Sequence, residues 1–189
     1  MTINPVTRHR RSIRLQGYDY TSTGAYFITI VTQDRKCLFG DVVDGQFRSN
    51  NWGQIVQDEW DRSALIRREI ELDAFIAMPN HVHAIIVIPD AKGRATRRSP
   101  LQSGPAKRSL GAFVGGFKSA VTKRIKALRG SLDTPIWQRN YFEHIIRNDE
   151  SLNRIRQYIF DNPVRWEFDR ENPLAAKPEP KDVWRTCSL

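Results

Sequence analysis

The chain has 189 residues, 40% of them hydrophobic, which is enough for one domain with a substantial core. No apolar run approaches the roughly 20 residues of a membrane-spanning helix, and the mean hydropathy of −0.54 predicts a soluble protein. The first 14 residues lack a signal-peptide core, and the two cysteines have no zinc-type spacing, so we expect a cytoplasmic protein with free thiols. A formal net charge of +9 indicates a polyanionic partner, with nucleic acid before a membrane surface.

The first half of the chain alternates short strand-like and helical patterns. Residues 1–16 are basic and irregular, and form either a solubilising tail or an arm that contacts phosphates. The β-branched and aromatic run 25–32 predicts a strand, and Asp44-Gly45 predicts a hairpin turn. Apolar residues then recur with helical period up to about residue 68, after Asn50 or Asn51 as the helix cap.

The second half continues with two apolar strands, at 71–78 and 83–88. Residues 89–108 are rich in Gly, Pro, Ser and cations, which predicts a flexible basic loop within the domain. A helix at 110–128, a strand at 135–146 and a helix at 150–161 follow; Pro163 limits the last helix. The remaining residues read as a tail in which Trp166, Phe168 and Trp184 can dock.

This order of elements predicts an α+β fold: a ferredoxin-like sandwich with an antiparallel sheet and helices packed mainly on one face. We expect a basic N-terminal arm at 1–16, a catalytic domain at 17–166 that includes the basic loop 89–108, and a C-terminal tail at 167–189.

The stretch 75–89, which reads as an apolar strand, a short break and a second apolar strand, carries a His-x-His motif at its middle. Side chains two residues apart on a strand point to the same side, so His81 and His83 can project together as half of a metal site. Two histidines alone do not make a site, because Mg²⁺ or Mn²⁺ needs further oxygen donors and zinc needs a third protein ligand. The simpler interpretation is a pair of half-exposed polar residues on an amphipathic strand.

The last helix offers the missing groups. Tyr158 and Asn162 are four residues apart and lie one above the other at the border of the apolar stripe. Asn162 can offer an amide oxygen to a metal. The phenol of Tyr158 is a nucleophile only when its proton, with a pKa of about 10, is lost, and a nearby divalent ion helps that loss. A tyrosine that only packs is the alternative.

Four motifs occur in one order: IRLQGYDY at 13–20, MPNHVH at 78–83, WQRNYFEHIIR at 137–147 and YIFDNPVR at 158–165. Together they resemble the single-tyrosine HUH transposases and, among these, the REP-associated tyrosine transposases. The resemblance covers roughly residues 8–166.

The resemblance implies a metal-dependent endonuclease and strand transferase that acts on single-stranded DNA. It implies cleavage at hairpin-forming, REP-like palindromes, with a 5′-phosphotyrosine intermediate and a free 3′-hydroxyl. Mapped onto this sequence, His81 and His83 hold Mg²⁺ or Mn²⁺, Tyr158 is the nucleophile, and Asn162 is the third ligand where another branch has glutamine. The family includes monomers and dimers, and a DNA-acting enzyme of this kind is expected in the cytoplasm at the nucleoid.

Three further residues of the 137–147 motif need interpretation. Tyr141 is a rival nucleophile if its strand faces the site. Glu143 and His144 are candidates for hydrogen bonds to a ligand histidine, with simple packing as the alternative.

Cations provide the candidate DNA contacts, because Arg and Lys follow a phosphate backbone while nearby aromatic rings stack unpaired bases. The candidates are Arg8, Arg10, Arg11, Arg14, Arg94, Arg97, Arg98, Lys107, Arg108, Lys118 and Arg147. Two other functions share the charge and the fold: a hairpin-DNA-binding protein without catalysis, and an RNA-binding ferredoxin-like domain with stacking aromatics on its sheet face.

Overall fold

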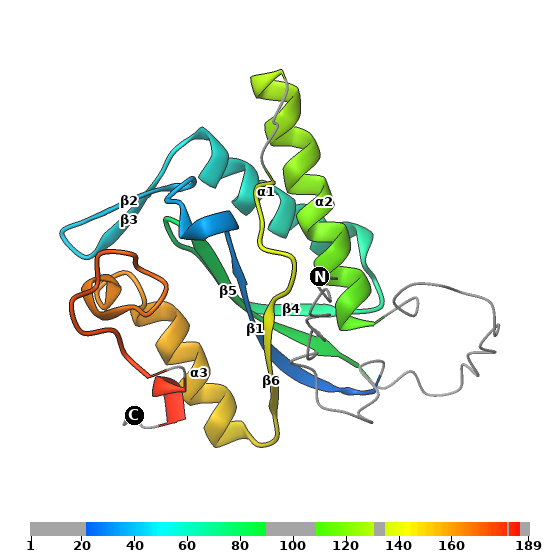
Figure 1. Ribbon diagram of the computed structural model, residues 1–189. Helices are drawn as coiled ribbons and strands as arrows, with labels where there is room; N and C mark the ends of the chain where they lie inside the picture. The colour runs from blue at the N-terminus through cyan, green and yellow to red at the C-terminus, as the bar shows by residue number, and fades with distance from the viewer. Residues whose placement is uncertain (1–21, 90–108, 131–134, 181, 186–189) are drawn as a thin grey trace, which may run out of the picture.

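The computed structural model describes residues 22–89, 109–130, 135–180 and 182–185 (Figure 1). Most of the predicted DNA contacts lie outside these residues and stay predictions. They are Arg8, Arg10, Arg11, Arg14, Arg94, Arg97, Arg98, Lys107 and Arg108. No helix within the described ranges is long and apolar enough to cross a bilayer.

A four-stranded antiparallel sheet forms the centre of the molecule. Its strands are β1 (Gly24–Val31), β4 (Glu71–Ala77), β5 (His81–Ile88) and β6 (Phe142–Ile146), in the order β4-β5-β1-β6. A separate hairpin pairs β2 (Gly40–Val43) with β3 (Gln46–Ser49), and Gly45 in its turn has a φ of 70°, a conformation that favours glycine. Strand β6 is shorter than predicted, because only its last five residues join the sheet.

Within the described residues, two helices connect strands and a third follows β6, and each begins at a polar cap whose side-chain oxygen accepts from backbone N–H groups. They are α1 (Asn51–Ile66), α2 (Leu110–Arg129) and α3 (Asp149–Asp161), capped by Asn50, Ser109 and Asn148 respectively. The sheet order and the sequence β1-α1-β4-β5-α2-β6 give the ferredoxin-like arrangement, so the predicted α+β class is confirmed.

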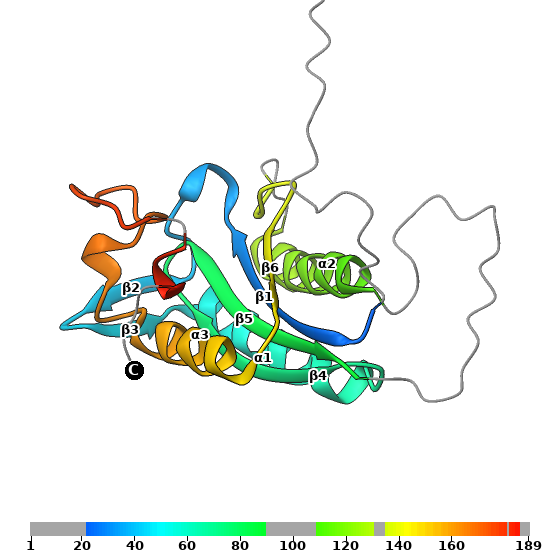
Figure 2. The ribbon, with the colours of Figure 1, turned by 90° about the horizontal axis from the view of Figure 1, so that it is seen from below.

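The sheet separates two apolar clusters. On one face, Ile28 and Ile86 pack with residues of α1 and α2, including Trp60 and Phe113. On the other face, Phe27 and Ile85 pack with residues of α3. Figures 1 and 2 show α2 and α3 on opposite sides of the strands. Two helices thus share one face, and α3 packs on the other.

The segment after α3 returns to the α3 face of the sheet. It contains the short helices η2 (Trp166–Phe168) and η3 (Val183–Arg185). Trp184 is 3% exposed and belongs to the α3-side cluster, as the sequence predicted for a docking residue. The boundary at residue 167 stays a prediction, but the described part of the predicted tail contributes the buried residues Asp169 and Trp184.

Candidate metal and nucleophile site

His81 and His83 lie side by side on the α3 face of β5. Their neighbours on the adjacent strand β1 are Val31 and Thr29 respectively, and the centroids of the two imidazole rings are 4.5 Å apart. Their exposed fractions are only 0% and 3%. The interpretation as a half-exposed polar pair is therefore wrong, because buried imidazoles need partners or a ligand.

Each ring has a defined polar neighbour at Nδ1. His81 Nδ1 lies 2.9 Å from Oδ1 of Asn80, and His83 Nδ1 lies 2.9 Å from Oγ1 of Thr29. Burial, followed by the neighbouring His81, lowers the pKa of His83 well below its ordinary 6.5, although a hydrogen bond to the Ile28 backbone acts in the opposite direction. His83 is therefore neutral near pH 7, the form in which an imidazole binds a metal.

Tyr158 reaches this pair from α3. Its hydroxyl oxygen is 3.4 Å from His83 Nε2, and its ring is 7% exposed, edge-on to Phe27. Burial, followed by the carboxylates of Asp169 and Glu179, raises the pKa of Tyr158 above its ordinary 10. The side chains present therefore keep the phenol protonated at neutral pH.

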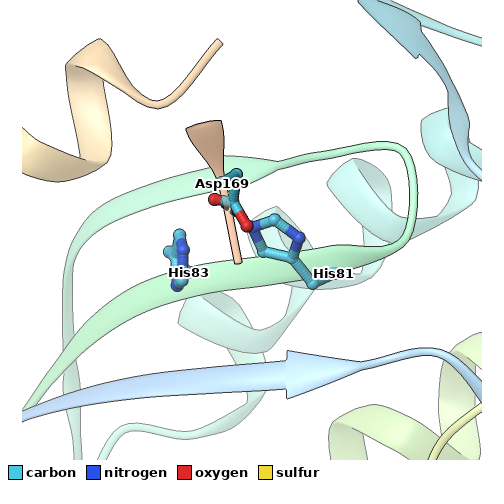
Figure 3. Close-up of side chains that lie close together, drawn as sticks. All are labelled: His81, His83 and Asp169. Carbon is cyan, nitrogen blue, oxygen red and sulfur yellow. Dashed lines mark ion pairs between the residues drawn. The ribbon is translucent and has the colours of Figure 1, made fainter. Parts of the chain in front are cut away.

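A third metal-type ligand, Asp169, comes from the segment after η2, where the sequence had predicted only a tail. Its carboxylate is 3% exposed, and Oδ2 is 3.8 Å from His81 Nε2. One ligand atom from each of His81, His83 and Asp169 falls within 4.8 Å of the others (Figure 3). Sequence reasoning missed Asp169 because it sits between two other acids, Glu167 and Glu171, and no spacing distinguishes the three.

Asn162 also lies at the site, as predicted, but its observed contact is with the carboxylate. Its Nδ2 donates to Asp169 Oδ2 at 3.3 Å. The amide oxygen of Asn162 and the Nε2 atom of His81 are buried with no hydrogen-bond partner among the described residues. Buried imidazole nitrogen and amide oxygen atoms without partners, next to a buried carboxylate, fit a bound divalent cation.

The 137–147 motif is divided between the two faces of the sheet. Tyr141 packs with the α1/α2-side cluster, so it lies on the opposite face from the histidines. Phe142 and Ile146 of β6 belong to the α3-side cluster, and side chains alternate along a strand, so Glu143 points to the opposite face, with Tyr141. This position corrects the prediction that Glu143 lies beside the metal ligands. His144 does face α3, where its ring centroid is 5.8 Å from that of Trp184.

Two predicted DNA contacts fall within the described residues. Lys118 Nζ donates to the backbone oxygens of Gln138 and Asn140, and burial lowers the Lys118 pKa to about 8. Lys118 thus holds the segment that leads into β6, and its phosphate contact stays a prediction. Arg147 is exposed just after β6, where its DNA contact stays a prediction.

Comparisons with known proteins agree with the motif resemblance. No family model matches the chain. The chain is 39% identical to an uncharacterized protein of Haemophilus influenzae over 173 residues, and the alignment covers 88% of this chain and 95% of that protein. The two proteins therefore belong to one family. A second H. influenzae protein, named "Putative REP-associated tyrosine transposase", is 28% identical over 148 residues, 78% of this chain and 74% of that protein.

Among solved structures, a REP-associated tyrosine transposase bound to a REP hairpin matches 82% of this chain and 74% of its own chain, with 19% identity and a TM-score of 0.49. The sequence similarity to the second of these proteins confirms the resemblance to the REP-associated tyrosine transposases that the motifs predicted.

Proposed function

We propose that this protein is a transposase-type enzyme, a metal-dependent single-stranded DNA endonuclease and strand transferase that cleaves at hairpin-forming palindromes. One observation carries the proposal: the Tyr158 hydroxyl lies 3.4 Å from His83 Nε2, within the buried group that His81, His83 and Asp169 form. A potential nucleophile and a set of cation ligands thus meet on one sheet face. The related protein named as a REP-associated transposase supports the substrate class.

In the proposed reaction, the Tyr158 oxygen attacks the phosphorus of a phosphodiester and forms a phosphotyrosine bond. The bond from phosphorus to the 3′ oxygen breaks, the phenol proton is lost, and the leaving oxygen takes up a proton to become a free 3′-hydroxyl. When a 3′-hydroxyl attacks the phosphotyrosine, the phosphodiester is restored and Tyr158 is released. Each step exchanges one phosphoester bond for another, so rejoining needs no separate energy source.

The chain's own residues have separate parts in this reaction. His81, His83 and Asp169, with Asn162 as a further candidate, would hold Mg²⁺ or Mn²⁺. The bound cation supplies positive charge that favours the phenolate and neutralises phosphate oxygens. Asn162 already hydrogen-bonds the Asp169 carboxylate and so limits its rotation. Tyr158 is buried and its ring lies 5.9 Å from that of Trp184 in η3, so η3 would have to move before a DNA strand could reach the phenol, while Asp169 stays at the site.

Hairpin DNA would be bound by the basic residues outside the described ranges, together with Arg147, and the protein would act in the cytoplasm at the nucleoid as a monomer or homodimer. A DNA-binding protein without catalysis is the second candidate, and the burial of Tyr158 favours it. The RNA-binding alternative loses support, because α1 and α2 cover one face of the sheet and α3 covers the other.

A covalent-adduct assay tests the proposal. The protein is incubated with single-stranded DNA that carries a palindrome from its own genome, with Mn²⁺ or with EDTA, and separated under denaturing conditions. We expect a protein–DNA adduct only with Mn²⁺, its loss in Tyr158→Phe, and its retention in the matched control Tyr141→Phe. If the wild type binds the hairpin in a mobility-shift assay but forms no adduct with Mn²⁺, the protein is the non-catalytic binder.

A further inference from the structure

Asn80 lies in the turn that leads into β5, and its buried side chain makes polar contacts with three different residues. Its Nδ2 donates to the backbone oxygen of Arg35 at 3.0 Å and to the backbone oxygen of Glu171 at 2.6 Å. Its Oδ1 lies 2.9 Å from His81 Nδ1. Asn80 is 0% exposed, and its backbone oxygen accepts from the N–H of Thr32, so both ends of the residue are fixed.

These contacts determine which nitrogen of His81 carries the proton. A carboxamide NH₂ group has two donor hydrogens, and Asn80 uses both on carbonyl oxygens that can only accept. The amide therefore cannot be turned around, and its oxygen faces His81. An amide oxygen only accepts, so a neutral His81 donates from Nδ1 and leaves a lone pair on Nε2. Nε2 is the nitrogen that faces Asp169.

The same side chain holds the segment that carries Asp169. The backbone oxygen of Glu171 accepts from Asn80, while the Glu171 N–H donates to Asp169 Oδ1 at 2.6 Å. The Glu171 carboxylate pairs with Arg35 Nε at 2.9 Å. With Oδ1 engaged in its own turn, Asp169 presents Oδ2 to His81.

We propose that Asn80 is a positioning residue for the metal site, which fixes the neutral tautomer of His81 and docks the third ligand, Asp169, from a distant part of the chain. The Asn80 amide thereby holds His81 and Asp169 in a fixed position relative to each other. The metal-binding consequence rests on the proposed function, whereas the tautomer and the docking are properties of the metal-free protein. They can be measured without activity.

Two variants separate the effect of Asn80 on the His81 tautomer from its effect on the docking of the Asp169 segment. Asn80→Asp keeps an acceptor for His81 Nδ1–H but removes both donors to the carbonyl oxygens. Asn80→Ala removes the acceptor and the donors, so His81 can instead place its proton on Nε2, towards Asp169. The readouts are ¹⁵N NMR of the imidazole rings at alkaline pH without metal, and hydrogen exchange over residues 166–180. His83, which is oriented by Thr29, serves as the internal control in every spectrum.

We expect a protonated Nδ1 in His81 of the wild type and of Asn80→Asp, and a shift towards protonated Nε2 in Asn80→Ala. Exchange over 166–180 should rise in both variants. Mn²⁺ affinity, measured by calorimetry, should fall about 10–100-fold, as for other residues that orient metal ligands.

A wild-type His81 protonated at Nε2 overturns the proposal, as does unchanged exchange in Asn80→Asp. If Asn80→Ala does not fold, the wild-type and Asn80→Asp results still decide it. If the wild type shows the expected tautomer but binds no Mn²⁺, the metal site of the proposed function fails while the positioning role stands.

Discussion

The two faces of the sheet differ in chemistry: one is apolar and the other carries polar, titratable side chains. Neighbouring residues of the same strand contribute to both faces. On β5, Val82, Ala84 and Ile86 face α1 and α2 and belong to the large apolar cluster. His81, His83 and Ile85 face the other way, towards α3. Every one of these six residues is nearly inaccessible, with at most 3% of its surface exposed.

The difference between the faces lies in what compensates for burial. Burial of the apolar face is itself favourable, by about 25 cal/mol for each Å² removed from water. On the α3 face, burial of imidazole, phenol and carboxylate groups costs free energy unless each has a partner. Asn80 and Thr29 partner one nitrogen of each histidine, while His81 Nε2 and Asn162 Oδ1 have no hydrogen-bond partner among the described residues. Such a face is expected where ligand binding, and not stability alone, determines the residues.

The largest expected effect comes from removing a histidine of the α3 face. His83→Ala should reduce Mn²⁺-dependent adduct formation at least about 100-fold, because loss of a ligand should exceed the 10–100-fold cost of losing its orienting partner. The urea midpoint should also fall, because the substitution leaves a cavity and removes the hydrogen-bond partner of Thr29, so adduct yield is compared at equal folded fraction. Adduct yield and urea midpoint are measured on the same preparation, and an unchanged adduct yield would remove His83 from the site.

Asp169→Asn tests the ligand that the late segment contributes. Loss of the negative oxygen should weaken Mn²⁺ binding about 10-fold or more, in the range of changes at ligand-supporting positions. The matched control is Asp182→Asn, which alters a carboxylate that is 52% exposed in the same segment. Equal Mn²⁺ affinities for the two variants in a calorimetric titration would exclude Asp169 as a ligand.

The pH dependence of stability should report the buried histidine. Since the folded state lowers the pKa of His83, the unfolded chain binds its proton more readily. His83 adds no pH-dependent penalty above about pH 6.5, and the free energy of unfolding falls as the pH drops below that value, with a slope of up to about 1.4 kcal/mol per pH unit. In urea titrations without metal, His83→Asn should therefore show a shallower loss between pH 6.5 and pH 5. Identical slopes for variant and wild type would contradict a neutral buried His83.

The smallest effect comes from a matched pair of methylene deletions on neighbouring residues. Ile86→Val and Ile85→Val should each cost about 0.5–1.5 kcal/mol of unfolding free energy, because both side chains are 0% exposed. Only Ile85 packs in the cluster that contains Tyr158, so only Ile85→Val should also reduce adduct yield. A loss of activity in Ile86→Val at unchanged folded fraction would show that the faces are not independent.

Local patterns predicted most of the fold, because helix caps and strand alternation act over a few residues. Asn50, the β-branched run at 25–32 and the Asp44-Gly45 turn each specified their element without distant contacts. The strand predicted at 135–146 was too long because residues before 142 are held differently: Trp137 forms an isolated bridge with Thr32, and Lys118 binds carbonyl groups of this segment. That arrangement depends on α2, which a local pattern cannot include.

The site could be predicted only in part for the same reason. The spacing of His81 and His83 on a strand, and of Tyr158 and Asn162 on a helix, places each pair on one face. Asp169 enters the site because its neighbour Glu171 contacts Asn80 and Arg35, which lie 91 and 136 residues from Glu171 in sequence. No spacing rule relates these positions, so the third ligand required the tertiary structure.

Identification of the residue that carries the DNA tests the central claim most directly. The Mn²⁺-dependent adduct is digested with protease and nuclease, and the peptide that bears the nucleotide is sequenced by mass spectrometry. A phosphodiester link on Tyr158, in the peptide from α3, is the predicted result. A link on Tyr141, or on any residue of the α1/α2 face, would contradict the assignment of the α3 face as the catalytic one.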